Sequence, residues 1–248
     1  MDFLVVNDGL RLCRHPDQLP FGTDALLLAA FLKAEVNGMA ADLGSGSGCL
    51  ALLAAKRGLY RQIYAVEMQE HLGGTEGLIA KNIRCNALED RVHVLCTTVQ
   101  NLRVTDFPAP LDAVFTNPPY FKQNSGKTNC RNALTLSRHE ICGDISDFCY
   151  AAGRILRFGG SFFCVYRPER IADLICAMRM ADLELKRLVL VCTDTRHAPS
   201  LLLAEGKKGG HGGAFLPRTL YLRNADGQMT EEYRSIYEEG TFHADFFR

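Results

Sequence analysis

The chain has 248 residues, 47% of them hydrophobic, and 28 basic side chains balanced by 28 acidic ones. This length and composition predict one globular domain and exclude a disordered chain, and the net charge of zero argues against a strongly basic nucleic-acid binder. No apolar run reaches the ~20 residues of a membrane helix, and the start of the chain lacks the pattern of a signal peptide, so we expect no membrane association.

Strands and helices are expected to alternate along the chain, which predicts a mostly parallel, doubly wound α/β sheet. The first helix should cover residues 24–34, with Thr23 as its N-cap, and the first strand residues 40–43. Next we expect a helix over 49–57, a strand over 63–67, a helix to about 86 weakened by Gly73, Gly74 and Gly77, and strands over 91–96 and 111–116. Later helices should cover 145–156, ended by Gly159 and Gly160, and 168–181, and later strands 161–166, 185–193, 201–205 and 219–222.

This pattern has no internal linker, so we expect one domain. A helical or extended N-terminal segment of about 1–38 should precede a Rossmann-like core of about 39–223, and an acidic tail of about 224–248 should follow it. The ten cysteines are scattered without a CxxC pair. That distribution favours reduced thiols in a cytoplasmic protein and predicts no metal site.

Two long polar segments, 121–136 and 205–216, are expected to be loops. From 121 to 139 there are four basic residues and no acid, and the second segment contains Lys207 and Lys208 between glycines. Basic side chains on loops can form a local phosphate-binding face. Taken alone, however, this charge pattern is more typical of ordinary surface scatter.

A glycine-rich turn follows the first strand. Asp42 ends that strand, and Gly44, Gly46 and Gly48 alternate with serines. The next strand ends in Glu67, whose carboxylate can accept hydrogen bonds from two ribose hydroxyls. The turn lacks the Gly-x-Gly-x-x-Gly spacing of dinucleotide sites, and an acid suits an ammonium group better than a pyrophosphate. The pattern therefore favours S-adenosylmethionine over a nucleotide with phosphates.

The most informative residues follow the strand over 111–116 and read Asn117-Pro118-Pro119-Tyr120. Prolines end a strand and stiffen the turn after it, and such turns lie where open α/β sheets bind ligands. The Asn117 amide oxygen and the Pro118 carbonyl can accept hydrogen bonds from a planar NH2 group, and the Tyr120 ring can stack on a base. We interpret the turn as a site that holds a planar amine or amide nitrogen beside an electrophile.

With these motifs the chain resembles the class I S-adenosylmethionine-dependent methyltransferases. The run Gly22-Thr23-Asp24-Ala25-Leu26-Leu27-Leu28, the pair Arg138-His139 before Glu140, and the ending from Thr219-Leu220-Tyr221-Leu222 to Ile236-Tyr237 resemble the bacterial tRNA1(Val) adenine N6-methyltransferases. This resemblance implies a Rossmann-like sheet of seven strands and S-adenosylmethionine as the cofactor. It also implies tRNA as the partner and, as the target, the adenine next to the anticodon.

The resemblance also implies roles for individual residues. Asn117 and Pro118 would hold the adenine N6 amine, and Tyr120 would stack on the base. The cofactor would be bound by Thr23, Asp24, Asp42, Gly44, Gly46, Gly48, Glu67 and Asn117, and by Thr98, which stands where relatives often carry Asp. RNA phosphates and bases would be contacted by Phe121, Lys122, Lys127, Arg131, Arg138, Lys207 and Lys208.

Other functions stay open at this point. The same turn serves methylation of a protein glutamine amide, although such enzymes usually have an N-terminal recognition domain for which residues before Asp42 leave no room. DNA adenine methyltransferases usually have a larger target-recognition region. A cofactor-binding protein that lost catalysis is a third alternative, for which Thr98 is the only hint. We expect a monomer.

Overall fold

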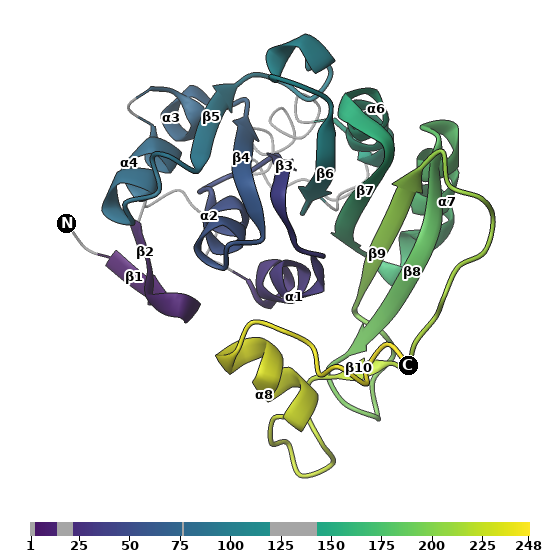
Figure 1. Ribbon diagram of the computed structural model, residues 1–248. Helices are drawn as coiled ribbons and strands as arrows, with labels where there is room; N and C mark the ends of the chain where they lie inside the picture. Colours follow the sequence, from purple (N-terminus) through teal and green to yellow (C-terminus); the bar gives the residue numbers. More distant parts are fainter. Residues whose placement is uncertain (1–2, 14–21, 76, 120–142) are drawn as a thin grey trace, which may run out of the picture.

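A sheet of eight strands runs through the residues that the computed structural model describes, which are 3–13, 22–75, 77–119 and 143–248 (Figure 1). The strand order is β10-β8-β9-β7-β6-β3-β4-β5, and among these only β9 is antiparallel to its neighbours. The mostly parallel, Rossmann-like sheet is confirmed. It has one strand more than the seven that the resemblance implied, and the two-residue β10 lies within the strand predicted over 219–222. The strands are β3 (Glu35–Leu43), β4 (Tyr60–Glu67), β5 (Val92–Cys96), β6 (Leu111–Thr116), β7 (Leu156–Tyr166), β8 (Leu183–Cys192), β9 (Leu201–Lys208) and β10 (Leu220–Tyr221).

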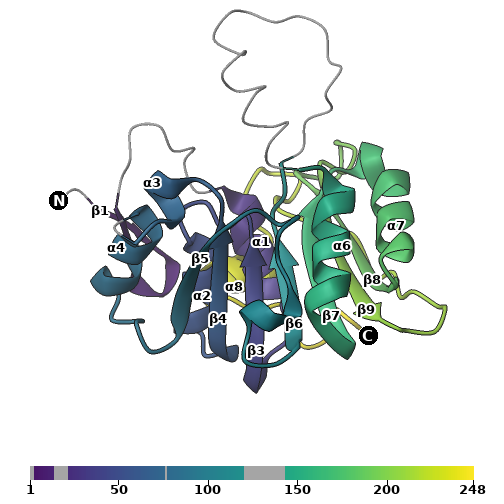
Figure 2. The same ribbon diagram turned by 90° about the horizontal axis from the view of Figure 1, so that it is seen from above.

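Helices cover both faces of the sheet (Figure 2). The central strands are continuous apolar runs because both of their faces are buried, as in Ala113, Val114 and Phe115 of β6. One hydrophobic layer contains side chains of α1 (Thr23–Phe31), α2 (Cys49–Lys56), α4 (Leu78–Cys85) and α8 (Glu231–Glu238). The other contains those of α6 (Ile145–Ile155) and α7 (Ile171–Met180). None of the described helices is long and apolar enough to cross a bilayer.

Several predicted boundaries were wrong. Helix α1 is capped by Gly22, without a side-chain hydrogen bond, so Thr23 is its first residue and not its N-cap. Helix α6 ends at Ile155, because the chain enters β7 at once, and Gly159 and Gly160 lie inside that strand. They lie where the register of β7 against β6 shifts, so they mark an irregularity in the strand and not the end of the helix.

The single helix expected after β4 is divided into α3 (Glu70–Gly73) and α4. Its glycines are explained by close packing against the end of β4. A Cβ atom on Gly73 would lie 2.7 Å from the Glu67 carbonyl oxygen, so only glycine lets α3 approach that strand so closely. The break therefore holds α3 beside Glu67.

Two further elements have no counterpart among the predicted ones. The strands β1 (Phe3–Val6) and β2 (Leu10–Cys13) pair as an antiparallel hairpin. Asn86 and the completely buried Asn82 of α4 hydrogen-bond the backbone of this hairpin at Arg11 and Cys13. At the other terminus, the region expected to be an acidic tail forms α8, which packs beside α1 (Figure 1).

Candidate active site

Three parallel strands bring the glycine turn, Glu67 and Asn117 to one edge of the sheet. In β3 and β6, Leu43 is paired with Thr116, and β4 lies on the other side of β3. The buried Thr116 hydroxyl donates a hydrogen bond to the Leu43 carbonyl at 2.7 Å, which joins the two strand ends. The residues after these strands therefore meet at the carboxyl edge, where open α/β sheets bind ligands.

The buried carboxylate of Asp42 holds the glycine turn through hydrogen bonds. Its side chain is buried, and its Oδ2 accepts hydrogen bonds from the Ser45 hydroxyl at 2.6 Å and the Ala51 N–H at 3.2 Å. Burial raises the pKa of Asp42 to about 7, and the Glu67 charge adds to this effect, although the two hydrogen bonds oppose it. Asp42 thus supports the turn through its hydrogen bonds. A cation bound nearby would favour its charged form and lower its pKa again.

The glycine turn lies directly against α4. Gly48 has a φ of 80°, and a Cβ atom there would lie 2.9 Å from Ile79 Cγ2. A side chain at this position is therefore excluded both by the backbone conformation and by the packing. The same turn reaches the next strand, because the Gly46 N–H donates to Glu67 Oε2 at 2.9 Å.

Glu67 accepts hydrogen bonds on both of its carboxylate oxygens. Besides the Gly46 contact, its Oε1 accepts from the backbone N–H of Gln69 at 2.9 Å and from Gln69 Nε2 at 3.3 Å. Each carboxylate oxygen can accept two hydrogen bonds, so one hydroxyl fits on Oε2 and a second can replace the long Gln69 contact. Thr98 is half-buried in the loop after β5, where the neighbouring Thr97 N–H donates to the Glu67 carbonyl.

Asn117 is held in one orientation by Asp24. Its Nδ2 donates to Asp24 Oδ2 at 3.0 Å, and Asp24 Oδ1 accepts the N–H of Ala25 at 2.9 Å in the first turn of α1. Because a carboxylate can only accept hydrogen bonds, this contact fixes the NH2 group of Asn117 on the side of Asp24 and the amide oxygen on the other side. Sequence reasoning assigned Asp24 to the cofactor and missed this contact, since no spacing links residues 93 positions apart.

The geometry of this edge agrees with comparisons to known proteins. A family model described as methyltransferase small domain matches residues 16–172, which is more than half of the chain. The chain belongs to this family of methyltransferases. It is 30% identical to a tRNA1(Val) (adenine(37)-N6)-methyltransferase of Aeromonas hydrophila, over 86% of each chain. It is 28% identical to the protein of that name from Escherichia fergusonii, over 87% of this chain and 85% of the relative.

Solved structures agree on the fold of this methyltransferase. A predicted O-methyltransferase from Agrobacterium tumefaciens superimposes with a TM-score of 0.70 at 20% identity, over 89% of this chain and 98% of that one. NSun6 from Pyrococcus horikoshii gives a TM-score of 0.56 at 13% identity, over 77% and 53%. At such identities the likeness concerns the fold alone.

The cofactor of this methyltransferase is S-adenosylmethionine, and the residues at the carboxyl edge fit that molecule. The turn from Gly44 to Gly48 contains only glycine and serine, and it donates hydrogen bonds to the carboxylates of Asp42 and Glu67. These residues offer acceptors for hydroxyl and ammonium groups, and none of them carries a positive charge that would bind a phosphate. Which residue contacts which part of the cofactor stays a prediction.

The prolines of the Asn-Pro-Pro-Tyr motif directly continue β6. Pro118 is buried and Pro119 is half-buried. The next residue, Tyr120, lies outside the described residues. So do the predicted RNA-contacting residues Phe121, Lys122, Lys127, Arg131 and Arg138, whose roles stay predictions.

Lys207 and Lys208 are not brought to the carboxyl edge. The segment expected to be a loop from 205 begins as strand β9, and Lys207 is paired with Ser161, which is paired with Ala113 near the amino end of β6. Lys208 donates to the carbonyl of Leu156, at the start of β7. Both lysines therefore lie toward the opposite edge from Asn117.

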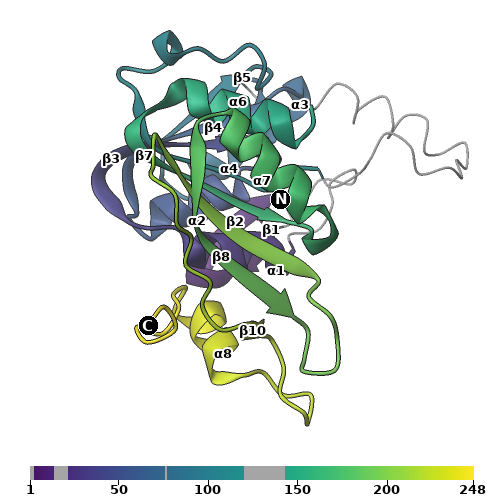
Figure 3. The same cartoon turned by 90° about the vertical axis from the view of Figure 1, so that its right-hand side faces the viewer.

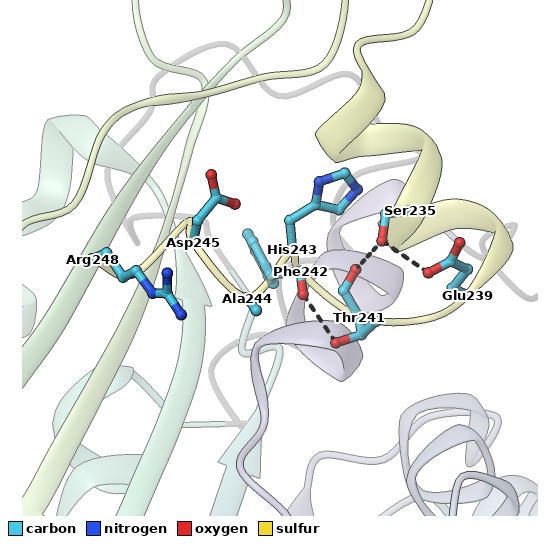
Figure 4. Close-up of a pocket in the computed structure, with 8 residues that line it drawn as sticks. All are labelled: Ser235, Glu239, Thr241, Phe242, His243, Ala244, Asp245 and Arg248. Carbon is cyan, nitrogen blue, oxygen red and sulfur yellow. Dashed lines mark hydrogen bonds between the residues drawn. The ribbon is translucent and has the colours of Figure 1, made fainter.

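A pocket near the C-terminus is also separate from the candidate active site (Figure 4). It lies between α8 and the last residues of the chain, where the Ser235 hydroxyl donates to the Thr241 carbonyl at 2.9 Å. None of the residues at the carboxyl edge lines it. It is lined by Ser235, Glu239, Thr241, Phe242, His243, Ala244, Asp245 and Arg248.

Proposed function

We propose that this enzyme methylates N6 of an adenine in tRNA, namely the adenine at position 37, next to the anticodon, of a valine tRNA. The observation that carries the proposal is the Asn117 amide, oriented by Asp24 beside the glycine turn. The names of the relatives from Aeromonas hydrophila and Escherichia fergusonii support the same substrate. We also propose that the enzyme acts as a cytoplasmic monomer, where tRNA is available and where the cysteines stay reduced.

In this mechanism the protein holds and polarises an amine. Bound S-adenosylmethionine supplies an electrophilic methyl group. The Asn117 amide oxygen, facing away from Asp24, accepts a hydrogen bond from one N6 hydrogen, and the Pro118 carbonyl accepts one from the other. These contacts pull the hydrogens out of the plane of the base, so the nitrogen lone pair becomes localised and aims at the methyl group.

The target base must leave its stack before it can reach this edge. Bases in RNA loops are already partly unstacked, so extrusion costs less there than in a duplex. Tyr120 is proposed to stack on the extruded adenine. No strong general base is needed at Asn117, because the proton can leave after the methyl group has been transferred.

A glutamine amide of a protein is the alternative substrate, because it also presents a planar NH2 group. The test is methyl transfer from labelled S-adenosylmethionine into tRNA that lacks the modification, followed by nucleoside analysis. We expect N6-methyladenosine at position 37 of a valine tRNA. Label in protein and none in tRNA would contradict the proposal and favour the amide substrate.

Asn117→Ala tests the proposed role of the amide. Loss of one preorganised polar contact to the reacting group typically lowers kcat about a hundredfold or more. We expect that loss with a nearly unchanged Kd for S-adenosylmethionine, measured by calorimetry. Asn37→Ala is the matched control, since Asn37 is exposed near the amino end of β3. A rise in the cofactor Kd that parallels the loss of rate would contradict this role.

A further inference from the structure

The turn after β8 carries basic side chains on the same edge as Asn117. Strand β8 is antiparallel to β9, and β9 to β7, so β8 runs in the same direction as β6 and β7. The turn at 193–200 between β8 and β9 therefore lies at the carboxyl edge of the sheet (Figure 3). Three strand spacings separate β8 from β6, which corresponds to about 14 Å.

Asp194 organises this turn. Its buried carboxylate accepts hydrogen bonds from the Arg196 N–H at 2.8 Å, from Arg196 Nη2 at 3.0 Å and from His197 Nδ1 at 2.7 Å. These contacts, that of His197 first, hold the pKa of Asp194 well below its usual range. The Arg196 side chain is 69% exposed, and the Asp194 side chain only 7%. A buried acid thus holds a guanidinium that is presented to solvent.

Two more arginines lie along the same edge. The Arg223 N–H donates to the Thr193 carbonyl at 2.9 Å, and its Nη1 donates to the Gly227 carbonyl at 2.7 Å. Arg167 directly follows β7, the neighbour of β6, and its Nη1 donates to the Ser200 carbonyl at 3.2 Å. Each of these guanidiniums is positioned by a backbone carbonyl.

Acidic side chains are also present near these arginines, so the edge is not uniformly positive. Asp173 is engaged in an ion pair with Arg170 at 2.9 Å, and Asp194 is engaged within the turn. Glu169 and Asp226 are exposed. The feature that matters here is therefore not net charge but three guanidiniums along one edge, each held by a backbone carbonyl or by a buried carboxylate. Ordered guanidiniums lose less side-chain entropy when they bind a phosphate, and they bind it with two parallel hydrogen bonds.

We propose that Arg167, Arg196 and Arg223, here called the arginine rim, bind phosphates of the RNA strand that delivers the target base to Asn117. This inference rests on the proposed function and names the surface that receives its substrate. RNA bound to the arginine rim approaches Asn117 along the sheet edge, from β8 across β9 and β7 to β6. The lysine pair Lys207 and Lys208, toward the opposite edge, does not face that RNA.

The experiment compares two doubly substituted proteins with the same loss of charge. One is Arg196→Gln with Arg223→Gln, and the other is Lys207→Gln with Lys208→Gln. Binding of the valine tRNA is measured by fluorescence anisotropy between 50 and 200 mM salt, without turnover. We expect the arginine variant to bind about tenfold more weakly, with a slope of log K against log salt reduced by roughly 1.4 to 1.8 for two lost phosphate contacts. The lysine variant should bind as the parent does.

The Kd for S-adenosylmethionine should stay at the parental value in both variants, since neither pair touches the glycine turn. The melting temperature is recorded for each variant, because Arg196 contacts the buried Asp194 and Lys208 donates to the Leu156 carbonyl. Weaker binding by the lysine variant alone would overturn the inference and place the RNA at the opposite edge. Equal weakening of tRNA binding in both variants would also overturn the inference, because nonspecific electrostatic attraction to RNA would then explain the result.

The outcomes keep this inference apart from the proposed function. If the parent forms N6-methyladenosine in tRNA but the arginine variant binds tRNA as the parent does, the arginine rim is wrong and the proposed function stands. If the parent methylates no adenine but the arginine variant loses tRNA binding, the rim stands and the proposed reaction is wrong. Absence of tRNA binding by the parent would overturn both.

Discussion

The contact between Asp24 and Asn117 makes a sharp prediction about catalysis. Replacing Asp24 with alanine removes the acceptor that fixes the Asn117 amide. The amide can then rotate by half a turn and present its NH2 group where its oxygen is needed. We therefore expect Asp24→Ala to act on the methyl-transfer step.

The size of the effect follows from the kind of hydrogen bond that is lost. A hydrogen bond to a charged group contributes about 1.5–3 kcal/mol. If that free energy holds the amide in its reactive orientation, its loss lowers the rate about 10- to 150-fold. Asp24→Asn should lose less, because an asparagine oxygen still accepts from Asn117 but carries no charge.

The assay is single-turnover methylation of tRNA at saturating S-adenosylmethionine, with the cofactor Kd measured separately. Asp106→Ala is the control, since that exposed carboxylate also accepts a backbone N–H, from Arg103 at 2.7 Å, but lies away from Asn117. Loss of the acid in the first turn of α1 also costs about 0.3–1 kcal/mol of stability, so the melting temperature is recorded for each variant.

A double-mutant cycle decides whether Asp24 acts through Asn117. In an Asn117→Ala background, Asp24→Ala should lower the rate little further, because the amide that Asp24 orients is already absent. Fully multiplicative losses would refute the reasoning. So would a cofactor Kd that rises by the same factor as the rate falls, since Asp24 would then act on cofactor binding.

Two further predictions concern the cofactor site. Because burial raises the pKa of Asp42 to about 7, and because its charged form attracts a cationic cofactor, affinity for S-adenosylmethionine should rise between pH 6 and pH 8. Calorimetry across this range should show that the affinity rises with pH in the parent and does not change with pH in Asp42→Asn. The same pH dependence in the variant would show that Asp42 is not its cause. Gly73→Ala should weaken cofactor binding, because its Cβ would lie 2.7 Å from the Glu67 carbonyl oxygen and force α3 away. Equilibrium dialysis that gave a parental Kd would show that Glu67 does not depend on this packing.

The raised pKa of Asp42 has a second consequence, for stability. The native state keeps the proton to higher pH than the unfolded chain does, so between about pH 4 and pH 7 the native state binds more protons. The contribution of Asp42 to the free energy of unfolding therefore falls as pH rises through this window. A bound cation at the turn opposes that loss by stabilising the carboxylate.

The elements around the site were predictable because their signals are local. Strand β6 covers Leu111–Thr116, as expected, since a continuous apolar run that ends in prolines has few other interpretations. Helix α2 begins at Cys49 for a similar reason, because the glycine turn leaves one place for it to start. Periodicity and turn residues thus predicted the elements that bring the glycine turn and Asn117 to one edge of the sheet.

The errors arose where tertiary pairing decides the structure. Residues 206–208 were expected to be a loop because glycine and lysine have low β-propensity. Pairing with β7 on one side and β8 on the other extends β9 to Lys208 despite that composition. The arginine rim was missed because its residues come from three separate segments, and only the sheet order brings them to one edge.

Helix α1 links the site to the end of the chain, which the composition indicated only as an acidic tail. Its first turn carries Asp24, and its last residue, Phe31, packs against Phe242 and Phe247 of the tail, with ring centroids 6.3 and 6.1 Å apart. Arg187 of β8 donates to the Phe31 carbonyl at 3.2 Å and stacks over the Phe31 and Phe247 rings. Because α1 is a rigid rod of nine residues, these contacts at one end help to fix the position of Asp24 at the other. The orientation of the Asn117 amide therefore depends on packing made by the last residues of the chain.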